Sequence, residues 1–153
     1  MFVDASAIVA ILTREPDADA LADRLEMAEA PITSPIAVFE AVAGLCRKRH
    51  ASVEEAAEDV RAFLAAAGIQ TVPIAPADAE TALLAFSRYG KGRGHPAQLN
   101  LGDCFAYAVA RERRVGLLFK GEDFNKTDIN AGPALRPAPT SGTRRSASPP
   151  PAR

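Results

Sequence analysis

The sequence contains little cysteine and no long apolar run. Its 153 residues include two cysteines, Cys46 and Cys104, which are far apart and lack the CxxC or HxxxH spacing of a zinc site. This usage argues against a disulfide-stapled secreted fold and favours a reduced chain with both cysteines as buried hydrophobes. No apolar run approaches the roughly 18 residues of a membrane span, and the first residues lack the basic segment of a signal peptide. We therefore expect a cytoplasmic protein with no membrane association.

Aromatic residues and histidines are also scarce. Tryptophan is absent and aromatic residues make up 6% of the chain, so the sequence offers no stacking platform for nucleic-acid bases. The two histidines, His50 and His95, follow a basic cluster and lie in a glycine-rich loop, where we expect both to be exposed. A metal-free mechanism that depends on a pair of histidines is therefore disfavoured.

Charge is distributed unevenly, although the net charge is only −1. Residues 131–153 carry four arginines and no acid, so this segment is +4 and the remainder is −5. The segment also holds six of the 12 prolines and a single large apolar residue, Leu135. Burial cannot offset the entropy of ordering such a segment, so we expect a disordered tail, either without a role or in contact with a phosphate backbone. Residues 1–130 then form one acidic domain.

Short apolar runs alternate with longer helical patterns along this domain. Strands are predicted at residues 2–3, 31–33, 69–74 and 115–119. Helices are predicted at residues 7–12, 17–28, 34–46, 52–68, 76–89 and 101–113. The alternation predicts a single α/β domain with a parallel sheet of about four or five strands and helices on both faces.

Several helix starts carry local signals. Ser34 precedes Pro35, which combines a capping hydroxyl with proline at the first helical position. Ser52 begins a capping box, and Asn100 is placed to cap the helix that follows it. We expect Ser6 to cap the first helix in the same way.

Four acids lie at strand ends or on helices, where functional groups of such sheets gather. Asp4 directly follows the first strand between core residues, where an ionised carboxylate must be paired or bound to a metal. Glu40 interrupts an apolar stretch, Asp103 opens a helix, and Asp123 follows the last strand. Converging carboxylates repel one another by several kcal/mol, and a hard divalent cation is the usual remedy. The acids therefore predict a metal site.

Each of these acids also has a purely structural explanation. Asp4 could cap the first helix, and Asp103 could interact with the dipole of its own helix. Glu40 could form an ion pair with Arg47 or Lys48 from a neighbouring turn. The joint position of the acids at strand and helix ends favours a functional site over these separate structural roles.

Four segments occur in a recognisable order. They are FVDASA at residues 2–7, the helix from Ser34 that carries Glu40, LNLGDCFAYA at residues 99–108 and LLFKGEDF at residues 117–124. In this order and at these separations they closely resemble the PIN-domain family, specifically the VapC-type toxins of bacterial toxin–antitoxin pairs. The resemblance spans residues 1 to about 130.

This resemblance implies a PIN-like fold and a Mg²⁺- or Mn²⁺-dependent endoribonuclease. Asp4, Glu40 and Asp103 would be metal ligands and catalytic acids, with the metal activating water at a phosphodiester of structured RNA of the tRNA or rRNA class. The family often has a fourth acid after the last strand, where this sequence has Gly121. Asp123 is the expected catalytic substitute, with Glu122 and Asp128 as the other candidates, and the number of metal ions stays open.

Basic groups must offset an acidic pocket if the chain binds RNA. The candidates are Lys91 and Arg93 in the loop of residues 90–94, whose glycines permit close backbone approach to a phosphate, and Lys120. The hydroxyl of Ser6 could bind the phosphate or a metal-bound water. A solvated flexible loop is the alternative for residues 90–94.

The resemblance further suggests a homodimer and a VapB-type antitoxin. The antitoxin's C-terminal helix would lie over the second helix and the helix of residues 52–68, with an arginine reaching the acidic pocket. The alternative is a catalytically weak PIN-like module that binds RNA or a partner, favoured by Gly121. A phosphotransfer protein is disfavoured because Ser6 replaces the second aspartate of the dehalogenase pattern. A dinucleotide-binding protein is disfavoured because no GxGxxG follows the first strand.

Overall fold

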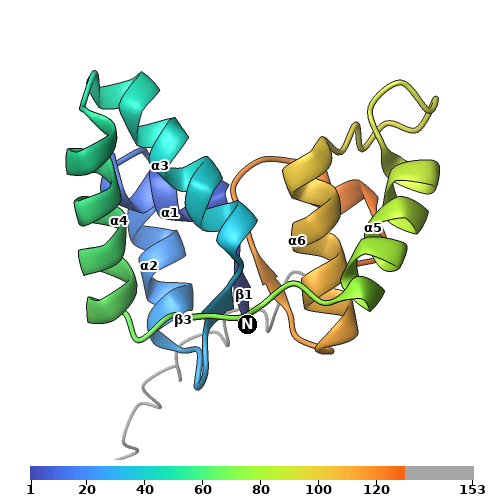
Figure 1. The fold of residues 1–153 in the computed structure, drawn as a ribbon, viewed down its shortest axis with the longest axis horizontal. Helices are drawn as coiled ribbons and strands as arrows, with labels where there is room; N and C mark the ends of the chain where they lie inside the picture. Colours follow the sequence, from blue (N-terminus) through green and yellow to red (C-terminus); the bar gives the residue numbers. More distant parts are fainter. Residues whose placement is uncertain (130–153) are drawn as a thin grey trace, which may run out of the picture.

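Four parallel strands form the centre of the protein (Figure 1). The structure is a computed structural model and describes residues 1–129. The strand order is β3-β2-β1-β4. The strands are β1 (Phe2–Val3), β2 (Ile32–Thr33), β3 (Gln70–Thr71) and β4 (Leu117–Leu118). The predicted α/β fold with a parallel sheet is confirmed, with four strands. The predicted disordered tail at residues 131–153 lies outside the described residues.

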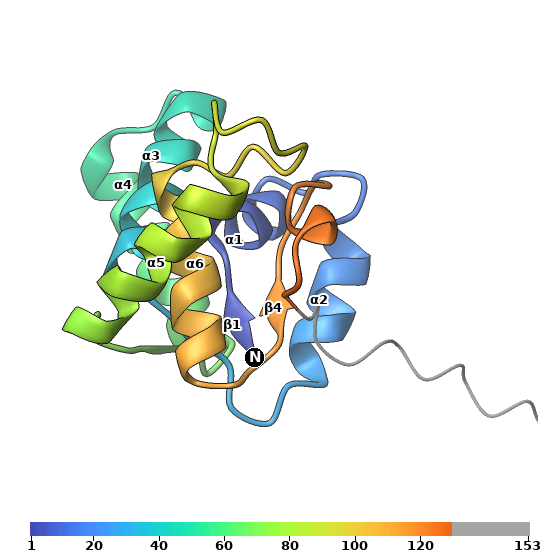
Figure 2. The same cartoon turned by 90° about the vertical axis from the view of Figure 1, so that its right-hand side faces the viewer.

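Six α-helices and one 3₁₀ helix follow the strands or connect them. Their bounds are α1 (Ala5–Leu12), α2 (Ala18–Glu26), α3 (Pro35–Arg49), α4 (Val53–Ala66), α5 (Pro76–Tyr89), α6 (Leu101–Glu112) and η1 (Phe124–Lys126). Figure 1 shows α1 to α4 on one side of β1, with α5 and α6 on the other. Figure 2 shows β1 and β4 side by side between α6 and α2, so helices cover both faces of these strands. Within residues 1–129, no helix is long and apolar enough to span a membrane.

β1 lies inside the sheet and is fully buried. Phe2 pairs with Ile32 on one side and with Leu117 on the other, and Val3 pairs with Leu118. The two residues of β1 have no exposed surface, which agrees with their wholly apolar character. The carboxyl end of β1, where Asp4 stands, is therefore held between two neighbouring strands.

Two local predictions need correction. The strands predicted at residues 69–74 and 115–119 are two residues long each, and both residues of β3 are exposed at the edge of the sheet. The cap of α1 is Asp4 rather than Ser6, because Asp4 has extended backbone angles and its carboxylate accepts from the Ser6 N–H at 2.9 Å. The predicted caps Ser34, Ser52 and Asn100 are present.

A buried ion pair joins the start of α5 to the end of α6. The Arg113 guanidinium donates to Asp78 at 2.9 Å and to the Pro73 carbonyl at 2.7 Å, and Asp78 is 1% exposed. Replacing Arg113 with methionine leaves a buried carboxylate without its partner, so we expect a loss of about 3 kcal/mol in unfolding free energy. Thermal melting measures this as a Tm lower by roughly 6–12 °C.

The matched control is Arg61→Met, because Arg61 forms an exposed ion pair with Glu58 on α4. Exposed pairs contribute at most about 1 kcal/mol. Equal melting temperatures for the Arg113 and Arg61 variants would show that the buried pair does not hold α5 and α6 together.

Candidate active site

Asp4 lies at the carboxyl end of β1 and is 3% exposed. One of its oxygens, Oδ2, accepts from the Ser6 N–H at 2.9 Å and from the Ser6 hydroxyl at 2.5 Å. The Ser6 hydroxyl oxygen in turn accepts from the Lys120 N–H at 3.0 Å. Burial raises the pKa of Asp4, and the hydrogen bonds from Ser6 oppose that rise. Ser6 therefore fixes the orientation of the Asp4 carboxylate and ties it to the segment after β4.

Glu40 on α3 and Asp103 on α6 face Asp4 from two other elements. Burial raises the pKa of Glu40 to about 7, with further contributions from the charges of Asp4 and Asp103. Burial also raises the pKa of Asp103 to about 6, which the hydrogen bond from Asn100 opposes and the charges of Asp4 and Asp123 reinforce. The three carboxyl groups are thus electrostatically coupled, as expected for acids gathered without a counter-ion.

Asp103 both caps the start of α6 and lines the cleft. Its Oδ2 accepts from the Asn100 N–H at 2.8 Å, while its own N–H donates to the Asn100 side chain at 3.0 Å. This capping box fixes the first turn of α6. The capping accounts for one carboxylate oxygen only, so the other can serve a ligand.

Gly102 is a site residue that sequence reasoning missed. A Cβ atom at this position would lie 1.9–2.2 Å from the carboxyl atoms of Glu40, so any other residue would force that carboxyl group to move. The start of α6 is therefore the surface against which the Glu40 carboxyl rests. The sequence signal that could have identified Gly102 is a glycine at the second position of a segment whose other residues favour a helix.

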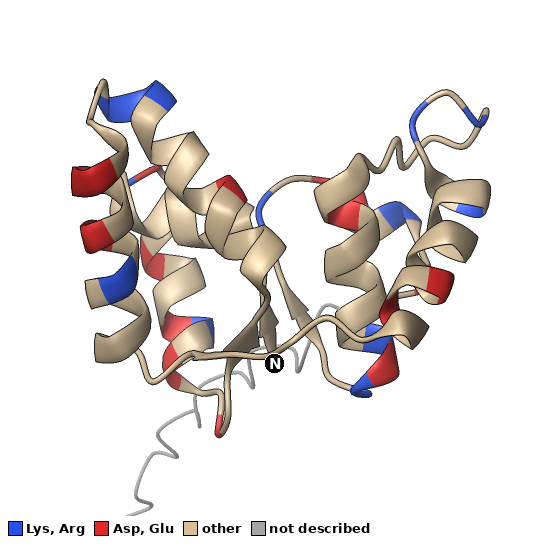
Figure 3. Ribbon diagram, viewed as in Figure 1, with Lys and Arg blue, Asp and Glu red and all other residues tan. Residues whose placement is uncertain are grey.

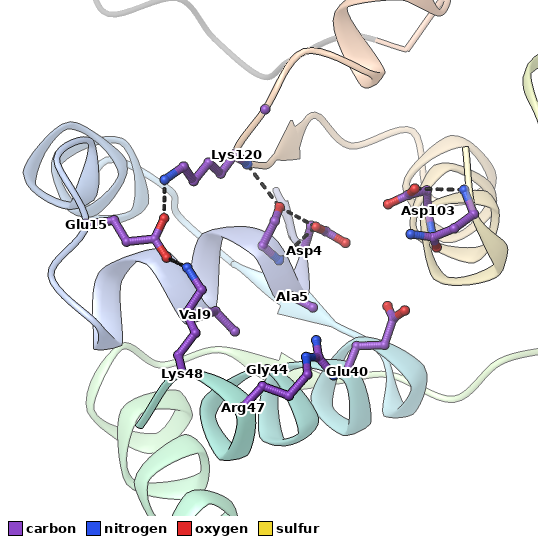
Figure 4. Close-up of a pocket in the computed structure, with 13 residues that line it drawn as sticks. Asp4, Ala5, Val9, Glu15, Glu40, Gly44, Arg47, Lys48, Asp103 and Lys120 are labelled. Atoms are coloured by element: carbon purple, nitrogen blue, oxygen red, sulfur yellow. Dashed lines mark hydrogen bonds and ion pairs between the residues drawn. The ribbon is translucent and has the colours of Figure 1, made fainter. Parts of the chain in front are cut away.

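These carboxylates open into one cleft of about 530 Å³. It is lined by Asp4, Ala5, Ser6, Val9, Glu15, Glu40, Gly44, Arg47, Lys48, Asn100, Asp103, Lys120 and Gly121. Figure 4 shows Glu40 and Asp103 on one side of Asp4, with Glu15, Lys48 and Lys120 on the other. Figure 3 shows acidic positions on α3 and at the start of α6, on either side of the segment that follows β4. The cleft therefore has an acidic side and a rim that carries lysines.

The ion pair with Arg47 or Lys48 that was the structural alternative for Glu40 is absent among the described residues. Lys48 pairs with Glu15, and Arg47 affects Glu40 only through its charge, which lowers the pKa. The structural explanation for Glu40 is therefore wrong, because Lys48 has a nearer acid in Glu15.

The donor set suits a hard divalent cation. As the side chains lie, residues 1–129 hold no group of three Asp, Glu, His or Cys side chains close enough to bind one ion together. Mg²⁺ requires less than that, because it keeps several waters and takes one or two carboxylates together with substrate phosphate. Asp4 is a buried carboxylate with no cation partner among the described residues, which is the kind of group that a metal ion compensates.

The predicted fourth acid lies near the others but outside the cleft lining. Asp123 precedes η1, its charge raises the pKa of Asp103, and it pairs with Lys126 at 3.4 Å. Asp128 is engaged elsewhere, because it accepts from the Tyr107 hydroxyl at 2.5 Å and from Arg111 at 3.1 Å. Among the candidates after β4, Asp123 is thus the one coupled to the cleft.

The predicted RNA-binding residues divide into two groups. Ser6 and Lys120 line the cleft, whereas Lys91 and Arg93 lie on the loop that follows α5 and are exposed. The Arg93 guanidinium lies 4.6 Å from the centroid of the Phe86 ring, so it covers α5 rather than the acids. His95 is half-buried against Tyr89, with ring centroids 4.9 Å apart, so its predicted exposure is wrong.

The raised pKa of Glu40 predicts a pH-dependent stability. Between its ordinary value of 4.5 and about 7, the folded chain binds more protons than the unfolded chain, so stability falls as pH rises through this window. We expect metal-free protein to melt at a higher temperature at about pH 5.5 than at about pH 7.5. In Glu40→Gln this difference shrinks by several degrees. An unchanged difference in that variant would show that Glu40 does not titrate as its position implies.

Comparison with known proteins places this chain in a family. The PIN domain family matches residues 1–130. The chain is a PIN domain of the VapC group. It is 45% identical over 139 residues to a VapC ribonuclease of Rhizobium meliloti, which covers 84% of this chain and 98% of the relative. It is 39% identical over 129 residues to the ribonuclease VapC28 of Mycobacterium tuberculosis, at 84% and 95% coverage.

A solved structure shares the fold of this PIN domain. The crystal structure of VapC20 from Mycobacterium tuberculosis, a sarcin–ricin loop cleaving toxin, superposes with a TM-score of 0.66 at 18% identity. The match covers 85% of this chain and 96% of the other. The PIN domain and VapC resemblance of the four sequence segments is therefore confirmed.

Proposed function

We propose that this PIN domain is the toxin of a type II toxin–antitoxin pair and a Mg²⁺- or Mn²⁺-dependent endoribonuclease of the cytoplasm. The observation that carries the proposal is the convergence of Asp4, Glu40 and Asp103 on one cleft with raised pKa values and no ion-pair partner among the described residues. Such perturbed, uncompensated acids in a cleft are typical of functional sites. The names of the VapC ribonuclease relatives support the same activity.

The three carboxylates would hold the cation, with Asp4 and Asp103 as direct ligands and Glu40 as a ligand or as the group that orients water. When bound, the cation supplies an activated water and charge neutralisation at the phosphate. Ser6 keeps Asp4 oriented, and Gly102 leaves the space in which Glu40 lies. Asp123 acts as an auxiliary acid through its charge on Asp103.

The substrate class that we propose is structured RNA of the tRNA or rRNA kind. Lys120 and Ser6 lie at the cleft and would contact the phosphate next to the cut, whereas Lys91 and Arg93 would contact more distant phosphates from the loop after α5. Aromatic residues make up 6% of the chain and tryptophan is absent, so recognition would depend on RNA shape and unpaired loops.

We propose a VapB-type antitoxin and a homodimer as partners. An apolar groove of about 270 Å³ between α2 and α4, lined by Ile11, Leu25 and Phe63 among others, is suited to an amphipathic antitoxin helix. The exposed apolar side chains Leu83, Leu84 and Leu101 on α5 and α6 would be covered by a second copy of the chain.

Cleavage of total cellular RNA by the purified chain, freed of any partner, tests this proposal. We expect discrete fragments with Mg²⁺ or Mn²⁺, none with EDTA and none from Asp103→Asn, and mapping of the new 5′ ends identifies the RNA. RNA binding without cleavage under every metal condition would contradict the nuclease and favour the binding-module alternative.

A further inference from the structure

Glu15 forms ion pairs with two lysines, Lys48 and Lys120, that line the same cleft as the proposed catalytic acids. It lies in the turn between α1 and α2, where its N–H donates to the Ala10 carbonyl at 3.0 Å and the Thr13 hydroxyl donates to its Oε1 at 3.2 Å. Its side chain is 15% exposed. The carboxylate is therefore held in place by the turn itself.

The two lysines bind opposite oxygens of this carboxylate. Lys48, from the last turn of α3, pairs with Oε1, and Lys120, from the segment after β4, pairs with Oε2. Lys120 also lies 3.1 Å from the Asp17 carboxylate. The bonds from Lys120 and Lys48 lower the pKa of Glu15 to about 2, so the carboxylate stays ionised. Three separate segments thus meet at one anion.

Lys48 and Lys120 line the same cleft as Asp4, Glu40 and Asp103. The backbone N–H of Lys120 donates to Ser6, which touches Asp4, so the long side chain of Lys120 starts beside the carboxylates. Figure 4 shows this side chain extended away from Asp4 toward Glu15. Lysine has a flexible stem and a compact charge, so it can turn toward whichever acid is available.

We infer that Glu15 is a positioning residue that holds Lys48 and Lys120 on the rim and keeps their ammonium groups off Asp4, Glu40 and Asp103. The inference rests on the proposed metal-dependent function, because it concerns the availability of those acids for a cation. An ammonium group that entered the cleft would neutralise the acids and compete with the metal. Glu15 thereby keeps the metal site open while leaving both lysines beside the path of a phosphate backbone.

Mn²⁺ binding by the full chain, measured by isothermal titration calorimetry without RNA, tests the inference. We expect Glu15→Gln to weaken Mn²⁺ affinity by about tenfold, in the range found when outer-shell partners of metal sites are removed. The control Asp17→Asn also removes one negative charge beside Lys120 but leaves Glu15 in place. The Mn²⁺ affinity of this variant should therefore stay within about twofold of wild type. The double variant Glu15→Gln/Lys120→Met has the formal charge of wild type and recovers most of the affinity.

The outcomes separate this inference from the proposed function. Equal affinities in wild type and Glu15→Gln would overturn the role of Glu15 alone. A double variant as weak as the single one would overturn the part assigned to Lys120. Wild-type protein that binds no Mn²⁺ would overturn the metal site and this inference together. Circular dichroism of each variant confirms that it is folded at the titration temperature.

Discussion

Replacing Asp4 with asparagine is expected to lower RNA cleavage at least 100-fold while leaving the fold intact. Asp4 is the most buried of the three acids and stands at the centre of the sheet's carboxyl edge. Asparagine retains an oxygen that accepts from the Ser6 N–H, so the cap of α1 persists. It lacks the negative charge that compensates the charge of a bound cation. This substitution thereby separates the capping role of Asp4 from its proposed role as a metal ligand.

In this variant the cleavage rate should fall while the melting temperature does not. The raised pKa of Asp4 means that its ionised form disfavours the folded state, so a neutral asparagine leaves the melting temperature unchanged or higher at neutral pH. Initial cleavage rates and thermal melts of the same preparations measure both quantities. The matched control is Asp19→Asn, an exposed acid in the first turn of α2. Comparable cleavage by both variants would remove Asp4 from the active site.

Gly102→Ala is expected to reduce cleavage about 100-fold without lowering stability. The new methyl group would occupy the position of the Glu40 carboxyl, which lies at the end of a flexible side chain and can move aside. A displacement of about 1 Å in a reacting group is sufficient for a 100-fold loss. Alanine also favours a helix over glycine by up to about 1 kcal/mol, so the melting temperature does not fall.

A double-mutant cycle shows whether this loss acts through Glu40. Glu40→Gln and the double variant Gly102→Ala/Glu40→Gln should then have nearly equal rates, because the methyl group has no catalytic carboxyl left to displace. Multiplicative losses in the double variant would mean that Gly102 acts on something other than Glu40. Steady-state cleavage of one mapped RNA fragment by the four proteins completes the cycle.

The fold follows from patterns that are local in the sequence. Apolar runs such as residues 117–118 alternate with capped helices, and the requirement that parallel strands have helical crossovers leaves few arrangements. The same rule places Asp4 at the carboxyl edge. Composition does not fix the strand lengths: residues 69–74 are β-like except for Pro73, which cannot donate to a ladder, and they pair over only two positions at an exposed edge.

Site residues that stand out in their own sequence context could be predicted. Contacts between segments that are distant in the sequence could not. A buried acid such as Asp4 is conspicuous in an apolar context. The contact between Glu40 and Gly102 depends on how α3 approaches α6, which no spacing in the sequence encodes. The pairing of Lys120 with Glu15 is likewise a contact between segments 105 residues apart. The prediction that Ser6 caps α1 is wrong because serine and aspartate are both good caps and only the backbone angles distinguish them.

The most direct measurement is the anomalous scattering of Mn²⁺ in crystals of the chain soaked with that ion. We expect a peak in the cleft beside Asp4 and Asp103, within ligand distance of at least one carboxylate oxygen, that is absent from crystals of Asp4→Asn. A strong Mn²⁺ peak elsewhere in crystals with an empty cleft, or an unaltered peak in that variant, would contradict the assignment of these acids as the metal site.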